Sequence, residues 1–208
     1  MTSTTDADGV TRMGPEDGLP VLLLHPWWGI TPAVHEWADA LAGAGRRVVL
    51  PDLYGGRTAA TVEEAEALHE AMDEEAVLAL IGRLADELAA EGRPWAAMGF
   101  SMGAFYASGL AGRADSGPDE LILFYGGQAP EGPVKRTRRV DLHIVPDDEY
   151  FTDEELAETD EGFRKAGVEL RTFEYGECGH WFAERESPGF DESAYALARA
   201  RVIGQLGG

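Results

Sequence analysis

The chain has 208 residues, of which 44% are apolar, which is enough for one hydrophobic core and a single domain over residues 1–208. Its 17 basic and 38 acidic residues give a net charge of −21, spread along the sequence, and predict neither a nucleic-acid partner nor binding to anionic membranes. The one cysteine, Cys178, excludes an intrachain disulfide and a cysteine-based metal cluster, and it favours a reducing compartment.

The N-terminal segment is polar, and we expect about the first nine residues to be flexible. It has neither the basic segment nor the apolar segment of a secretory signal. No apolar run in the chain reaches the length of a membrane-spanning helix. We therefore predict a cytoplasmic protein that has no membrane partner.

From residue 20 onward, short apolar runs alternate with amphipathic segments. Buried strands are expected at 20–25, 46–56, 94–100, 120–127 and 140–145, and an exposed or edge strand at 168–175. Helices are expected at 31–45, 62–91, 102–111, 153–166 and 191–206. This alternation predicts an α/β fold, with a mostly parallel central sheet and helices on both faces. Ligands bind such sheets at the carboxyl ends of the strands, so the functional residues should follow the apolar runs.

One serine stands where a predicted strand meets a predicted helix. Residues 99–103 read GFSMG, which matches the G-x-S-x-G pattern with Ser101 at its centre. In this motif a sharp turn lifts the serine out of the core and holds it at a helix N-terminus, and a side chain at either glycine would crowd the neighbouring elements. The sequence therefore predicts that Ser101 is a nucleophile.

A serine nucleophile needs a general base, and the base needs an acid that orients it. In a fold of this kind the three residues follow the order serine, acid, histidine along the chain. His180 follows the last predicted strand, so we expect it to be the base. Asp147 and Asp148 follow the strand before it, and position alone allows either to be the acid. Structural roles are expected for the other four histidines, His25, His35, His69 and His143.

The tetrahedral intermediate of acyl transfer needs two donors for its negative oxygen. One is expected at the backbone N–H of Met102, the residue after the nucleophile. The other should come from the loop after the first buried strand, which reads HPWWG. Pro26 has no N–H, so Trp27 is the best candidate and Trp28 the next.

Aromatic residues follow several of the predicted strands. We predict that Trp28, Tyr125 and Trp181 contact substrate, because large aromatic side chains beside a cleft exclude water and hold apolar groups. Phe105 and Phe182 are further candidates for the same wall. A place in the core is the alternative for these residues, and for Trp28 the two interpretations are equally supported.

The segments HPWWGI, LPDLYGG, GFSMGAFYA, the Asp-Asp pair and GHWFAE, in this order and in a chain this short, resemble the dienelactone hydrolase family of α/β-hydrolases. The resemblance covers nearly the whole chain from Pro20 onward. It implies a compact α/β-hydrolase without a large cap domain, which acts on small esters or lactones with a nucleophile–His–Asp triad. Carried over residue by residue, it places the nucleophile at Ser101, the acid at Asp148, the base at His180 and the second oxyanion donor at Trp27.

Three positions depart from the best-known members of that family. Those members carry a cysteine nucleophile, where this chain has Ser101. They carry a glutamate after the first strand, where this chain has Pro26, and an arginine four residues after the histidine, where this chain has Glu184. The family's arginines bind a substrate carboxylate, so the resemblance does not extend to specificity for dienelactone itself.

We therefore expect a serine hydrolase that cleaves a small carboxylic ester or lactone through an acyl-enzyme. An acyltransferase with the same triad and a non-catalytic ligand-binding protein are the alternatives. No H-E-x-x-H motif and no Gly-rich phosphate loop occurs, so no metal and no cofactor are expected. The expected partner is the small-molecule substrate, and the sequence leaves a homodimer open.

Overall fold

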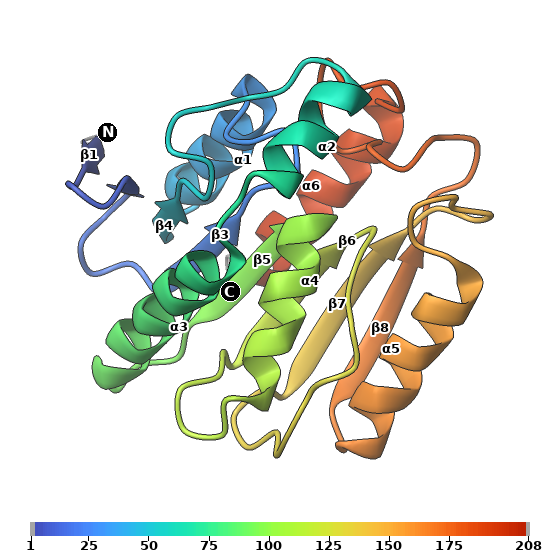
Figure 1. Ribbon diagram of the computed structural model, residues 1–208. Coiled ribbons are helices and arrows are strands. Elements are labelled where there is room, and N and C mark those ends of the chain that lie inside the picture. Colours follow the sequence, from blue (N-terminus) through green and yellow to red (C-terminus); the bar gives the residue numbers. More distant parts are fainter. Residues whose placement is uncertain (1–2, 207–208) are drawn as a thin grey trace.

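The computed structural model of the protein describes residues 3–206, and a single eight-stranded sheet runs through its centre in the order β1-β2-β4-β3-β5-β6-β7-β8 (Figure 1). β1 and β2 pair antiparallel at one edge, and the strands from β4 to β8 pair parallel. The strands are β1 (Ser3–Thr5), β2 (Val10–Met13), β3 (Pro20–Leu24), β4 (Arg47–Pro51), β5 (Ala96–Phe100), β6 (Glu120–Phe124), β7 (Arg139–Ile144) and β8 (Glu169–Glu174).

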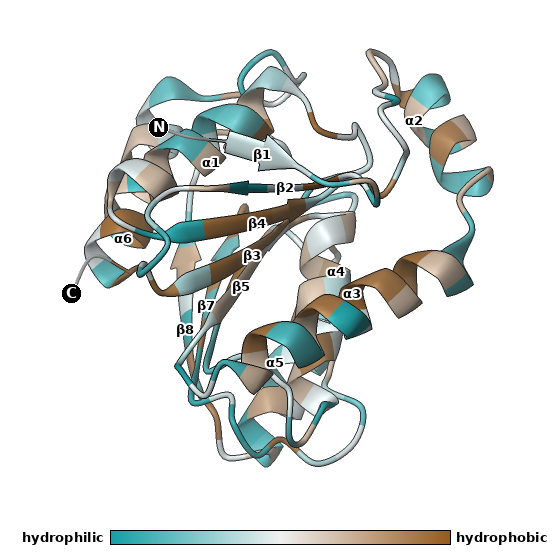
Figure 2. Ribbon diagram, turned by 90° about the vertical axis from the view of Figure 1, so that its left-hand side faces the viewer, coloured by the Kyte–Doolittle hydropathy of each residue, from teal (hydrophilic) through white to brown (hydrophobic). Residues whose placement is uncertain are grey.

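Helices cover both faces of this sheet, as Figure 2 shows with the sheet between them. The helices are α1 (Pro32–Gly43), α2 (Val62–Glu70), α3 (Glu74–Ala90), α4 (Met102–Gly109), α5 (Asp153–Lys165) and α6 (Glu192–Leu206). Side chains of α1 and α6 belong to one apolar core, and side chains of α3, α4 and α5 belong to the other. The predicted α/β fold, with a mostly parallel sheet and helices on both faces, is confirmed.

The central strands are apolar on both faces because both faces are covered. β3 is buried at all five of its positions. Val21 and Leu23 point into the core beneath α1 and α6, whereas Leu22 and Leu24 point into the opposite core. Successive side chains of β3 point to opposite faces, and both faces are buried. The strand is therefore a continuous apolar stretch in the sequence.

The N-terminal segment, expected to be flexible over about its first nine residues, contains a short strand. Residues 3–5 form β1, which pairs with β2, and the sequence patterns did not predict either strand. β2 in turn pairs with β4, so these polar strands extend the sheet beyond its buried centre. Residues 1–2 of the segment lie outside the described residues.

The long helix expected at 62–91 is two helices with a break between them. Thr61 caps α2 by accepting a hydrogen bond from Glu64 N (3.3 Å), and Asp73 caps α3 by accepting one from Ala76 N (3.0 Å). An aspartate side chain competes with the helical backbone for these N–H groups, so it favours a new helix start over continuation. The break therefore places the start of α3 at Glu74.

The segment between β6 and β7, residues 125–138, contains no helix or strand, so no cap domain is inserted there. β8 lies at the edge of the sheet, as its alternating sequence predicts. Within residues 3–206, no helix combines the length and the apolar character that crossing a membrane requires.

Candidate active site

Ser101 occupies the tight turn between β5 and α4, at the carboxyl end of a central strand. Its backbone has a φ of 48° and a ψ of −112°, a conformation that is strained for a residue with a side chain. A Cβ added to Gly99 would collide with the backbone of Gly103, and one added to Gly103 would collide with the backbone of Leu24. The two glycines are therefore needed for the turn that carries the serine.

Two loops bring a histidine and an aspartate to this serine. The loop after β8 carries His180, whose Nε2 lies 2.9 Å from the Ser101 Oγ. The loop after β7 carries Asp148, whose carboxylate oxygens lie 2.8 and 2.9 Å from the His180 Nδ1. The side chains of His180 and Asp148 are only 3% and 2% exposed, so water competes little for these hydrogen bonds.

The structure separates the two neighbouring aspartates that sequence position could not. Asp148 faces His180, and its Oδ1 also accepts hydrogen bonds from the N–H groups of Tyr150 (2.9 Å) and Phe151 (3.2 Å), which fix the carboxylate. Asp147 is exposed and has a φ of 52°, so it takes the corner of the turn and its side chain points elsewhere. Asp148 is the aspartate that the family resemblance assigns as the acid, and its role stays a prediction.

The two expected oxyanion donors lie on elements that flank Ser101. Met102 is the first residue of α4, so its N–H has no acceptor within the helix. Trp27 follows β3 in a turn closed by the hydrogen bond from Gly29 N to Pro26 O (3.1 Å). Among the hydrogen bonds within residues 3–206, neither the Trp27 N–H nor the Met102 N–H donates to a protein acceptor.

A cavity of about 470 Å³ opens beside Ser101. Most of its wall is aromatic, from Trp27, Phe105, Tyr106, Tyr150 and Trp181. Met102, His69 and Glu74 complete the wall around the serine. The cavity offers an apolar chamber in front of a hydrogen-bonded serine, which suits a small substrate with an apolar portion.

Two of the three predicted substrate-contacting aromatics lie away from this cavity. Tyr125 is fully buried, with its ring 4.8 Å from the His180 ring and its hydroxyl hydrogen-bonded to Glu184 Oε1 (2.6 Å). Trp28 is 5% exposed and packs edge-on against Trp181 at 5.0 Å. Tyr125 and Trp28 therefore pack against site residues without lining the cavity. Of the three predicted aromatics, only Trp181 lines it. The further candidate Phe182 is also fully buried.

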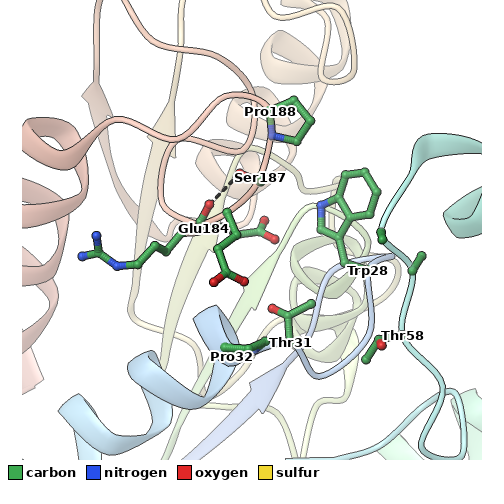
Figure 3. Close-up of a pocket in the computed structure, with 11 residues that line it drawn as sticks. Trp28, Thr31, Pro32, Thr58, Glu184, Ser187 and Pro188 are labelled. Carbon is green, nitrogen blue, oxygen red and sulfur yellow. Dashed lines mark hydrogen bonds between the residues drawn. The ribbon is translucent and has the colours of Figure 1, made fainter.

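Trp28 borders a second, smaller cavity of about 240 Å³, drawn in Figure 3. Thr31, Thr58 and the segment that begins at Glu184 surround it. Glu184 itself is 2% exposed, and its burial raises the pKa of the carboxyl group to about 8. The family resemblance implies an arginine at this position, and this chain has a buried acid there.

Four residues of the main cavity were not predicted as site residues: Tyr150, Tyr106, His69 and Glu74. Tyr150 packs on both His180 (5.0 Å) and Trp181 (4.7 Å), and its place two residues after Asp148 was the one available signal. His69, expected to be structural, lies in the last turn of α2 and lines the cavity.

Two other histidines do have the structural roles expected of them. His25 is buried and accepts a hydrogen bond from Leu53 N at its Nε2 (3.0 Å). His143 stacks on Phe124 with ring centroids 4.3 Å apart, and its burial lowers its pKa to about 3. Among residues 3–206, no group of three or more His, Cys, Asp or Glu side chains is placed to hold a metal ion.

The sheet order, the helices on both faces and the turn that carries a serine between β5 and α4 define an α/β-hydrolase. Solved structures share this architecture. The dienelactone hydrolase-like promiscuous phosphotriesterase P91, from metagenomic libraries, superposes with a TM-score of 0.76 at 20% identity, covering 99% of this chain and 96% of that one. Esterase 2 of Thermogutta terrifontis superposes with a TM-score of 0.64 at 17% identity, covering 95% of this chain and 88% of that one.

Sequence comparison places the chain within this class. The sequence model of the dienelactone hydrolase family matches residues 9–207. Carboxymethylenebutenolidase 1 of Cupriavidus pinatubonensis (strain JMP 134 / LMG 1197) is 30% identical over 206 residues, covering 90% of this chain and 85% of that protein. The chain belongs to the dienelactone hydrolase family, and it is a hydrolase of ester-like substrates.

Proposed function

We propose that the protein is a serine hydrolase that cleaves a small carboxylic ester or lactone through an acyl-enzyme on Ser101. The observation that carries the proposal is the continuous line of hydrogen bonds from Ser101 Oγ through the His180 ring to Asp148, at 2.9 and 2.8 Å. This is the geometry that converts a weak hydroxyl nucleophile into an effective one.

In the first half of the reaction, Ser101 Oγ attacks the substrate carbonyl carbon while its proton moves to His180 Nε2. Asp148 holds the other ring nitrogen protonated and stabilises the imidazolium that forms. The backbone N–H groups of Trp27 and Met102 receive the negative oxygen of the tetrahedral intermediate. As the C–O bond to the alcohol breaks, His180 returns the proton to the departing oxygen, and an ester remains between Ser101 and the acyl group.

In the second half, His180 takes a proton from water, and the water oxygen attacks the acyl carbon. The bond to Ser101 Oγ then breaks, and the proton returns to this oxygen from His180. With a lactone, the same steps open a ring. The 30% identical relative is a carboxymethylenebutenolidase, which supports lactones as one class of substrate. An acyltransferase would place an acceptor alcohol where this water stands.

The proposal is tested by treating the protein with a fluorophosphonate and measuring its intact mass. We expect one adduct on the wild type and none on Ser101→Ala, because only an activated serine reacts with this probe. The same pair should show hydrolysis of a small aryl ester by the wild type and a loss of several orders of magnitude in the variant.

The absence of an adduct on folded wild-type protein would contradict the proposal and favour a ligand-binding role. An adduct that persists in Ser101→Ala would place the nucleophile elsewhere. Measuring ester exchange with added alcohol beside hydrolysis separates acyl transfer from release by water.

A further inference from the structure

The cavity beside Ser101 carries an acid but no strong base. Of the described residues that line it, none is lysine or arginine, and Glu74 is the one carboxylate. His69 is the one imidazole among these lining residues. When this imidazole is neutral, Glu74 leaves a substrate in the cavity facing a negative charge.

Glu74 is held at this wall by the start of a helix. It is the first residue of α3, directly after the capping residue Asp73. A negative charge is favoured at this end of a helix, because the free N–H groups there carry a partial positive charge. None of the ion pairs and side-chain hydrogen bonds found within residues 3–206 involves the Glu74 carboxylate. Its charge therefore remains available to a molecule in the cavity.

Besides burial, the negative charge of Glu74 contributes to a raised pKa at the neighbouring Tyr106 phenol. Burial, and next the negative charge of Glu74, raise the pKa of Tyr106 to about 12. The two side chains share the cavity wall. The same field would disfavour a negative group on a substrate and favour a positive one.

The aromatic part of the wall suits an aryl group and tolerates a positive charge. The rings of Trp27 and Trp181 stack with centroids 6.0 Å apart, and Tyr150 packs on Trp181 at 4.7 Å. Phe105 and Tyr150 line the cavity and are 44% and 42% exposed, so parts of their rings are accessible to a ligand there. Faces of such rings attract both aryl groups and cations.

We infer that the substrate is an ester with an aromatic portion that is neutral or positively charged, and that Glu74 is the residue that selects against negatively charged esters. The inference rests on the proposed function, since it concerns the same cavity and the same serine. This substrate class differs in charge from the carboxylates that the arginines of the best-known family members bind, and those arginines are the feature to which the resemblance does not extend.

The test uses three phenyl acetates that differ in the para substituent: trimethylammonio, its neutral isostere tert-butyl, and carboxylate. Their kcat/KM values are measured at about pH 8, where histidine side chains are ordinarily neutral, for the wild type, Glu74→Gln and Glu75→Gln. Glu75 is the matched control, because it removes the same charge one residue along the same helix from a side chain outside the cavity. The ratio of variant to wild type for each ester cancels its intrinsic reactivity.

We expect Glu74→Gln to lower kcat/KM for the cationic ester about fivefold and to raise it for the anionic ester about fivefold, with the ratio for the neutral ester lying between the two. In Glu75→Gln all three ratios should stay within about twofold. Equal ratios for the three esters in Glu74→Gln, or the same charge-dependent shift in Glu75→Gln, would overturn the inference.

The kinetic comparison and the fluorophosphonate labelling distinguish a failure of charge selection by Glu74 from a failure of the proposed function. If Ser101→Ala abolishes hydrolysis of all three esters but their Glu74→Gln ratios are equal, only the assignment of charge selection is wrong. If the wild type hydrolyses none of the three and forms no fluorophosphonate adduct, the proposed function fails, and the inference fails with it.

Discussion

The hydroxyl of Tyr125 donates a hydrogen bond to Glu184, with 2.6 Å between the phenol oxygen and Oε1. Tyr125 directly follows β6, and Glu184 lies in the loop that carries His180, so this contact joins the strand end to that loop. The Tyr125 ring makes a second contact with the same loop, because it lies 4.8 Å from the His180 ring. Within residues 3–206 the second carboxyl oxygen of Glu184 has no hydrogen-bond partner, and the residue is 2% exposed. A charge on Glu184 is therefore poorly compensated, and the acid is held in its protonated form at neutral pH.

Glu184→Gln should make the stability of the protein less dependent on pH. Burial raises the pKa of Glu184 from 4.5 to about 8 in the folded chain. Between these values the folded state binds more protons than the unfolded state, so the free energy of unfolding falls as pH rises, by up to about 1.4 kcal/mol per pH unit. Glutamine cannot ionise, so the variant should lose this component and exceed the wild type in stability above about pH 8.

Urea unfolding of the wild type and of Glu184→Gln, measured between about pH 5 and about pH 9, checks this expectation. Glu186→Gln serves as the control, because that carboxylate lies two residues further along the same loop and is exposed. Its pH profile should follow the wild type. Parallel profiles for the wild type and Glu184→Gln would mean that Glu184 ionises without cost in the folded chain.

Replacing the two adjacent aspartates separately should have unequal effects on catalysis. Asp148→Asn removes the charge that holds and stabilises the His180 ring, so kcat should fall about ten-thousandfold. Asp147→Asn should change kcat by less than about threefold, because its side chain is exposed and asparagine tolerates the positive φ of this position. Steady-state kinetics on one aryl ester suffices, with circular dichroism to show that both variants fold. Two mild effects would place the orienting acid elsewhere.

Much of the fold could be predicted because buried parallel strands leave a plain signal. β3 and β5 are apolar on both faces and end at turn residues, so their place and the Ser101 turn after β5 could be predicted from the sequence. The positions of His180 and of the Asp147–Asp148 pair followed from the same rule, that functional residues come after strand ends. The polar pairing of β1 with β2 left no comparable pattern.

The rest of the site depends on geometry that spacing does not encode. Spacing left both aspartates open, whereas the structure places Asp148 against His180 and gives Asp147 the positive φ of the turn. Tyr125 follows the end of a strand, which is the position expected of a site residue. Its ring is nevertheless buried, and its hydroxyl donates a hydrogen bond to the buried Glu184. Glu74 reaches the cavity because the helical segment breaks before it, and periodicity predicted no break there.

A glycine outside the G-x-S-x-G motif packs against the serine turn. Gly126 follows β6, and a Cβ added to it would lie 2.6 Å from the backbone oxygen of Ser101. Neither backbone can yield without moving the serine turn, so Gly126→Ala should displace Ser101 by a few tenths of an ångström or more. A displacement of about 1 Å can cost about a hundredfold in rate, so kcat/KM should fall between about tenfold and about a hundredfold.

Gly127→Ala is the matched control, because the methyl group added there would meet the side chain of Thr159 at 3.2 Å rather than backbone. A side chain can rotate away, so this variant should keep kcat/KM within about threefold. Both variants are compared by aryl ester kinetics and by the rate of fluorophosphonate labelling, since labelling reports the position of Ser101 apart from substrate fit. If Gly126→Ala labels and turns over like Gly127→Ala, the serine turn tolerates movement of β6, and the glycine after that strand is not required for the position of the nucleophile.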